Sequence, residues 1–151
     1  MNLIGYWQSS SRDEQTLIHP RILVKERPYD DNEKAAIVRY MQLGVPCNHY
    51  RGFSGCRICG KILGTHERTD GKWVWPDKMD HYVDEHNIAL PEEFLHTMSE
   101  NNYEVPNVHL SSNIVGYDTE FWCKWSNARQ TKWLKTQEPI LEPIENPYEN
   151  N

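Results

Sequence analysis

The stretch Cys56-Arg-Ile-Cys59-Gly60 and the later stretch His81-Tyr-Val-Asp-Glu-His86 decide how we expect this chain to fold. Two cysteines separated by two residues, followed by two histidines separated by four, have the donor types and spacing of a tetrahedral zinc site. Gly60 follows the second cysteine, where a tight metal-binding turn favours glycine. We therefore predict zinc as the cofactor, held by Cys56, Cys59, His81 and His86.

The spacing of the donors also predicts the local structure. Residues five apart on a regular helix point roughly 140° away from each other, so we expect the helix to tighten or to end between His81 and His86. A frayed last turn near Asn87 would allow this. The 21 residues between the cysteine pair and the first histidine predict an enlarged hairpin between the metal-binding turn and the helix. Four protein ligands close the coordination shell, so we expect a structural ion.

Three further donors lie near this stretch. Cys47, His49 and His66 could each replace one of the four predicted ligands, and the sequence leaves this open, as it leaves open the role of Cys123.

Working outward, Asp30 and Asp31 are N-cap candidates for a helix that ends at Gly44. Residues 61–63 and 72–75 are expected to form a hairpin, with Asp70-Gly71 as its turn signal. The other expected elements are short strands at 4–8, 21–25, 108–110 and 114–115, a helix from Pro76 through both histidines, and a helix from Leu90 to about Asn102.

These elements predict an α+β fold: a small zinc-stabilised domain of zinc knuckle, β-hairpin and helix, with flanking helices, short strands and an aromatic-rich C-terminal segment. A chain of 151 residues has room for one such domain, which we place at 1–135, with the zinc module at about 47–97. Residues 136–151 are rich in glutamate and proline, so we expect a disordered tail or an extended strip docked on the domain.

Composition narrows the class of protein. The net charge is −6, and four glutamates after Lys135 account for much of it, which leaves −2 for the rest of the chain and argues against a general grip on nucleic-acid phosphates. No run approaches the roughly 18 apolar residues of a membrane span, and the N-terminus lacks the basic and apolar regions of a signal peptide. We therefore expect a cytoplasmic protein with reduced thiols and no membrane partner.

Two catalytic patterns start in the sequence and then fail. Gly52-Phe-Ser54-Gly-Cys56 has cysteine where a nucleophile elbow needs glycine. The stretch His66-Glu67-Arg-Thr-Asp70 has aspartate where a zinc-protease helix needs its second histidine. We therefore favour a protein that is not an enzyme.

The favoured function is a non-enzymatic module that binds another protein or regulates it, with Trp122, Trp125 and Trp133 as candidate partner-binding residues. One alternative is a nucleic-acid-binding zinc module, which would use the basic residues Arg51, Arg57, Lys61, Arg68 and Lys72. Another alternative is a metal-dependent hydrolase, which would keep a water on a zinc ion at the same four donors.

Several motifs together resemble a widespread family of small bacterial proteins that has no assigned activity. The motifs are Gly5-Tyr-Trp7, Arg51-Gly-Phe-Ser-Gly-Cys56-Arg-Ile-Cys59-Gly60, Trp73-Val-Trp75-Pro76, His81-Tyr-Val83 with His86, and Leu90-Pro91-Glu-Glu-Phe94. The resemblance covers about residues 4–97 and implies a cytoplasmic protein of bacterial or phage origin with a Cys/Cys/His/His metal site. The chain departs from the family at Asp77-Lys78-Met79, where family members often carry Glu-Gly-Leu.

Overall fold

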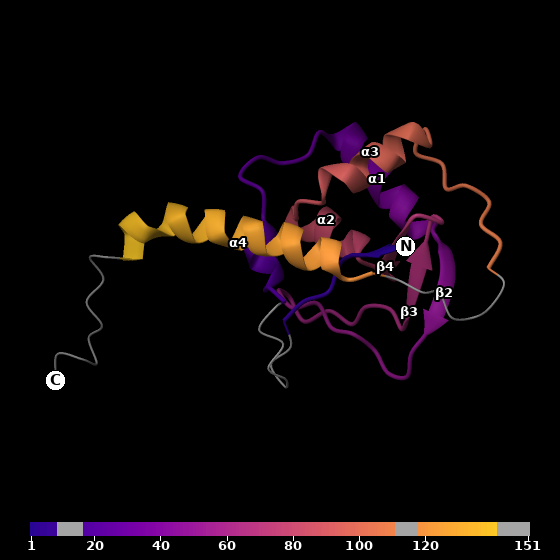
Figure 1. Cartoon of the computed structure of the whole chain (residues 1–151), viewed down its shortest axis with the longest axis horizontal. Coiled ribbons are helices and arrows are strands. Elements are labelled where there is room, and N and C mark those ends of the chain that lie inside the picture. The colour runs from indigo at the N-terminus through magenta and orange to yellow at the C-terminus, as the bar shows by residue number, and fades with distance from the viewer. Residues whose placement is uncertain (9–16, 111–117, 142–151) are drawn as a thin grey trace.

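The structure is a computed structural model that describes residues 1–8, 17–110 and 118–141. Its described part is α+β, as predicted: four α-helices and a short 3-10 helix are arranged around a four-stranded mixed sheet (Figure 1). In chain order, the elements are β1 (Asn2–Leu3), η1 (Pro20–Leu23), α1 (Asp31–Gln42), β2 (Val45–His49), β3 (His66–Thr69), β4 (Trp73–Pro76), α2 (Asp80–His86), α3 (Glu92–Glu100) and α4 (Glu120–Leu141).

The sheet has the strand order β1-β4-β3-β2, in which β1 runs parallel to β4 and the other neighbours are antiparallel. The turn between β3 and β4 is the predicted one. The Asp70 side chain accepts hydrogen bonds from the backbone N–H groups of Lys72, at 2.9 Å, and Trp73, at 2.7 Å. Gly71 has a φ of +95°, which favours glycine because it has no Cβ.

The core lies on one face of β4. Trp73 and Trp75 are two residues apart on the strand, so their side chains share this face, and both are at most 1% exposed. Phe94 of α3 lies 5.5 Å from the first indole and 5.2 Å from the second, and Tyr40 of α1 stacks on Trp75 at 6.2 Å. Val74, between the two tryptophans on β4, belongs to a smaller buried cluster. The two helices therefore cover the tryptophan face of the sheet.

Helix α1 confirms the prediction for residues 30–44. The Asp30 side chain accepts a hydrogen bond from the N–H of Glu33 at 3.3 Å and so caps the first turn. Gly44 follows the helix, where a Cβ atom would lie only 2.4 Å from the ring of Trp75. Glycine is thus needed here for packing against the core indole.

The predicted pairing of residues 61–63 with 72–75 is wrong. The antiparallel partner of β4 is β3, a strand of polar residues. Glu67 and Thr69 of β3 are buried because each has hydrogen-bond partners inside the fold. Ile62 instead forms an isolated bridge with Gly55.

Other boundaries also differ from expectation. The strand predicted at 21–25 is the 3-10 helix η1, which begins at Pro20, where the fixed φ of proline suits a first helical turn. Pro76 ends β4 and does not begin α2. The first strand is β1 and not residues 4–8, and residues 108–110 have no regular structure. The strand expected at 114–115 lies outside the described residues.

The aromatic residues of the C-terminal segment, from Phe121 to Trp133, all lie on helix α4. Its first part packs against β1 and η1, and its later part extends beyond the body of the domain (Figure 1). The boundary expected between residues 135 and 136 falls inside this helix, and residues 142–151 lie outside the described part. None of the described helices is long and apolar enough to cross a membrane.

Candidate metal centre

The first two donors lie on a tight turn, residues 56–60, which we call the knuckle. The backbone N–H groups of Ile58 and Cys59 approach the sulfur of Cys56 at 3.4 and 3.5 Å. The N–H of Gly60 donates to the Cys56 carbonyl at 2.9 Å, and a φ of +78° at this glycine lets the chain reverse. The knuckle therefore directs backbone N–H groups at a sulfur, which stabilises a thiolate.

The other two donors lie on α2, which ends directly after the second of them. His86 is the last helical residue, and Asn87 follows in the left-handed conformation at φ 51°. The Asn87 side-chain amide donates to the carbonyls of Lys25 and Arg27, which fixes the end of the helix. The rings of His81 and His86 then lie 5.0 Å apart. The helix ends at Asn87, near the expected place, but it stays helical through both histidines and does not end between them.

The structure brings all four predicted donors together. One ligand atom from each of Cys56, Cys59, His81 and His86 lies within 4.8 Å of the others, and the Cys59 sulfur is 3.3 Å from Nε2 of His81. Metal–ligand bonds of 2.0–2.3 Å in a tetrahedron place neighbouring donor atoms about 3.3–3.8 Å apart. The cluster could therefore hold a metal ion after only small adjustments.

The local electrostatics favour the protonation states that a metal requires. Burial raises the pKa of the Cys56 thiol, but hydrogen bonds from the N–H groups of Cys59 and Ile58 outweigh it, so the pKa lies below its usual value. Burial lowers the pKa of His81, and the nearby His86 and Lys61 lower it further. Thiolate and neutral imidazole are the forms that bind metal ions.

His86 gives a second indication that the donor set fits an ion. Its Nε2 is buried and has no hydrogen-bond partner among the described residues. A buried imidazole nitrogen without a partner costs free energy, and a metal bond would offset that cost.

Cys56 is 4% exposed and Cys59 is exposed, so the cluster lies at the surface with one buried side.

The three alternative donors do not join the cluster. Cys47 is a buried residue of β2, where burial and the charge of Glu67 raise its pKa to about 11, so it stays a thiol. His49 and His66 lie with their rings 5.2 Å apart. Within the described residues, Cys56, Cys59, His81 and His86 form the one group of donors close enough to share an ion.

The candidate partner-binding tryptophans differ in exposure. Trp122 is 1% exposed, packs edge-on against Trp7 at 5.3 Å and donates its indole N–H to a backbone carbonyl at 2.8 Å. Trp125 is half-buried and stacks on Trp122 at 5.4 Å. Trp133 is 37% exposed on the later part of α4. Trp122 is thus a core residue in this fold, and Trp133 has the most surface to offer a partner.

One of the basic residues proposed for nucleic-acid binding is already engaged. Arg68 forms an ion pair with Asp77 at 2.7 Å and donates to the carbonyl of Gly44 at 2.8 Å. The remaining four are exposed: Arg51, Arg57, Lys61 and Lys72.

A buried carboxylate near the knuckle was missed from the sequence. Glu67 is 1% exposed and accepts hydrogen bonds from the hydroxyl groups of Tyr6 and Tyr50 and from the side-chain amide of Asn48. Its donors come from separate parts of the chain, so no local spacing could indicate the group. The alternation of polar residues along β3, with every second one turned inward, is the one signal that was present.

Comparison with known proteins identifies no relative: no family model matches the chain, and no curated protein or solved structure is significantly similar to it. The resemblance to the small bacterial family therefore stays a prediction.

Proposed function

We propose that this chain is a zinc-stabilised, non-enzymatic module that binds a partner protein. The observation that carries the proposal is the meeting of Cys56, Cys59, His81 and His86 on two segments that have no other reason to place four soft donors together. Two thiolates and two imidazoles are a preferred donor set of zinc, and the lowered pKa values of Cys56 and His81 support it.

A structural role suits this donor set better than hydrolysis. A hydrolytic zinc site keeps one position open for water, whereas four protein donors fill the tetrahedral shell. The ion would tie the knuckle to α2 and so fix the position of a short helix of seven residues that has no side-chain N-cap.

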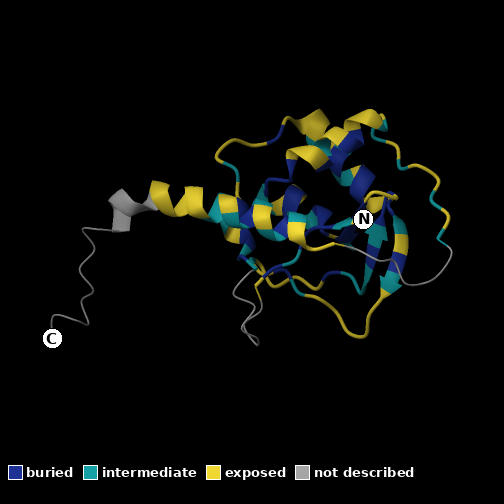
Figure 2. Ribbon diagram, in the orientation of Figure 1, coloured by how far each residue is buried: buried dark blue, intermediate teal, exposed yellow. Residues whose placement is uncertain are grey.

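The later part of α4 is the surface that we propose for the partner. It extends beyond the domain, and its residues 131–136 are exposed (Figure 2). Trp133 and Leu134 are 37% and 45% exposed, and Lys132 and Lys135 lie beside them. Tryptophan is enriched in binding hot spots and the two lysines attract acidic groups, so we expect a partner surface with an apolar centre and acidic surroundings.

The test is affinity capture from the host lysate with the tagged full-length chain, followed by native mass spectrometry at moderate salt. We expect one zinc per chain and a stoichiometric protein whose capture is lost in Trp133→Ala. Leu43→Ala is the control, because it also truncates an exposed apolar side chain, one that is 58% exposed and lies at the end of α1 and not on α4. Equal capture by the two variants would exclude the proposed surface, and capture of nucleic acid instead of protein would favour the alternative module.

A further inference from the structure

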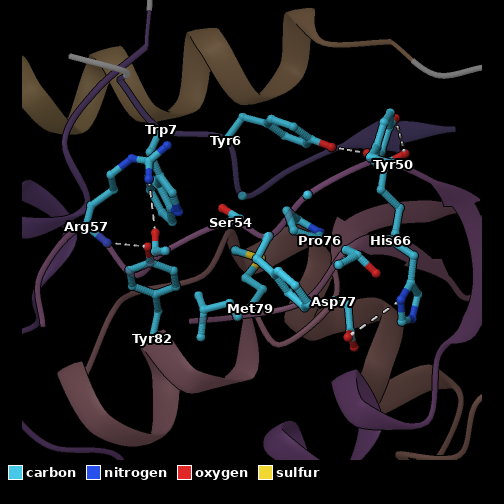
Figure 3. A pocket seen from close by; sticks show the side chains of 18 of the residues that line it. Tyr6, Trp7, Tyr50, Ser54, Arg57, His66, Pro76, Asp77, Met79 and Tyr82 are labelled. Carbon is cyan, nitrogen blue, oxygen red and sulfur yellow. Dashed lines mark hydrogen bonds and ion pairs between the residues drawn. The ribbon is translucent and has the colours of Figure 1, made fainter. Parts of the chain in front are cut away.

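A cavity beside the knuckle takes no part in the metal centre. We call it the knuckle pocket; it has a volume of about 580 Å³ and lies between residues 5–7, the loop 50–55, residues 63–67 and residues 76–82 (Figure 3). Cavities of about 300–1,000 Å³ are the size in which proteins bind small organic ligands.

Much of the pocket wall is aromatic. Trp7 and Tyr82 line it with their ring centroids 5.2 Å apart, and Phe53 also lines it although 74% of this residue is exposed. Exposed apolar surface next to a cavity gains free energy when a ligand covers it. Flat faces of this kind favour a ligand with a planar apolar body.

The charges of the pocket favour an anion. Its two carboxylates already have partners within the protein: Glu67 accepts three hydrogen bonds from neutral groups, and Asp77 forms an ion pair with Arg68 at 2.7 Å. Arg51 and Arg57 also line the pocket and are exposed, and neither has a carboxylate within 4.0 Å in the described part of the chain. Two guanidinium groups that have no acidic partner among the described residues attract anions.

His66 is a further polar residue of the pocket wall. This residue lines the pocket, its Nδ1 lies 3.7 Å from a carboxylate oxygen of Asp77, and its Nε2 is buried without a partner among the described residues (Figure 3). Burial and the neighbouring charge of Arg68 lower the pKa of His66 even though Asp77 acts to raise it. The ring is therefore neutral near pH 7 and adds no charge of its own to the pocket.

We propose that the knuckle pocket binds a small organic anion with a flat apolar body. The charged group lies at Arg51 and Arg57, and the ring lies against Trp7 and Tyr82. A mononucleotide and an aromatic carboxylate share this chemistry, so the experiment separates them. This site is distinct from the partner surface on α4 and does not depend on it.

The knuckle forms part of the pocket wall and links the pocket to the metal centre. Tyr82 lies between the two metal-binding histidines of α2, and its hydroxyl accepts a hydrogen bond from the backbone N–H of Arg57 at 2.9 Å. The metal centre therefore positions both Tyr82 and Arg57 on the pocket wall.

The test is titration of the ¹⁵N-labelled, zinc-loaded full chain with two matched pairs of probes, observed by NMR. The pairs are 2-naphthoate with 2-naphthamide, and adenosine monophosphate with adenosine. We expect at least one anion to shift the indole N–H signal of Trp7 and to bind about tenfold more tightly than its neutral counterpart, the size expected for two partly exposed charge-assisted hydrogen bonds. The anion that binds with the higher affinity then identifies the class of ligand.

Variants locate the binding. The double variant Arg51→Gln, Arg57→Gln should remove the tenfold preference for the anion, whereas Arg39→Gln, at an exposed position on α1, should keep it. Ser54→Phe should block every probe, because Ser54 lies in the pocket between Trp7 and His66 (Figure 3).

Ser99→Phe, on the exposed side of α3, is the control for an added phenyl group and should leave binding unchanged. Two results would overturn the proposal: anions that leave the pocket signals unmoved at millimolar concentration, or neutral probes that bind as tightly as the anions.

Discussion

The zinc concentration should control the stability of the fold with a predictable slope. The four donors lie on two segments, 56–59 and 81–86, and they come within 4.8 Å of one another only in the folded chain. An ion that binds the folded state and not the unfolded state adds RT ln(1 + [Zn]/Kd) to the free energy of unfolding. At free zinc about a thousand times Kd this is about 4.1 kcal/mol, and each further tenfold increase adds about 1.4 kcal/mol.

The assay is urea unfolding in zinc-buffered solutions, followed by the fluorescence of the buried tryptophans Trp73, Trp75 and Trp122. His86→Ala removes one of four ligands and should abolish most of the slope. Cys123→Ser removes a half-buried thiol outside the cluster and should keep it. Residual binding of zinc by the unfolded cysteine pair would reduce the slope somewhat. An unfolding midpoint that does not depend on free zinc would refute the structural role of the ion.

Three further perturbations follow from other contacts. Tyr40→Phe removes a buried hydroxyl that donates to Asp70 at 2.7 Å, so the free energy of unfolding should fall by about 1.5–3 kcal/mol in urea titration. Gly5→Ala should cost about 2–4 kcal/mol in the same assay, because φ is +84° and the added Cβ would lie 2.5 Å from the sulfur of the buried Met79. The pKa of His66 is lowered, mainly by burial, so the unfolded chain takes up its proton first as the pH falls below about 6.5 and stability declines. At saturating zinc, the free energy of unfolding measured from pH 7 to pH 5 should therefore decline less in His66→Gln than in the wild type.

Control variants test whether the expected losses of stability come from the named contacts or from any substitution of the same type. Tyr103→Phe removes a half-buried tyrosine hydroxyl that has no hydrogen bond in the described residues, and it should cost less than 1 kcal/mol. Gly52→Ala has the same kind of backbone strain, at φ +85°, but nothing lies within 4 Å of the new Cβ, so about 1 kcal/mol is expected. Equal losses in variant and control would contradict the contacts named above. A His66→Gln profile parallel to that of the wild type would show that this histidine does not titrate differently on folding.

The metal cluster was predictable because its signal is local. The spacing of Cys56, Cys59, His81 and His86 is visible in the sequence, and the chain only has to form a turn and a short helix to present them. Helix α1 was predictable for the same reason, since its cap at Asp30 and its apolar period lie within a dozen residues.

The pairing of the strands could not be predicted, because it depends on contacts between distant residues. Residues 61–63 are as apolar as an ordinary strand, whereas β3 is polar and becomes a central strand only because Glu67 and Thr69 find buried hydrogen-bond partners. The knuckle pocket was hidden for the same reason, as its walls come from four separate segments. The burial of Trp122 depends on Trp7, which lies more than a hundred residues earlier in the chain.

Removal of the metal ion by a chelator should weaken ligand binding in the knuckle pocket. Removal of the ion frees the knuckle and α2, so Tyr82 and Arg57 lose their fixed positions and probe binding should weaken by at least tenfold. The measurement is the NMR titration with the anionic probes, repeated in the presence of a zinc chelator. Unchanged probe affinity in the metal-free chain would show that the pocket is built without the ion.

The most direct test of the central claim is X-ray absorption at the zinc edge, combined with metal analysis of the purified full chain. The proposed function predicts one zinc per chain with two sulfur ligands at about 2.3 Å and two imidazole nitrogens at about 2.0–2.1 Å. A metal-free protein, or a shell that contains oxygen and fewer than two sulfur atoms, would contradict a closed site at Cys56, Cys59, His81 and His86.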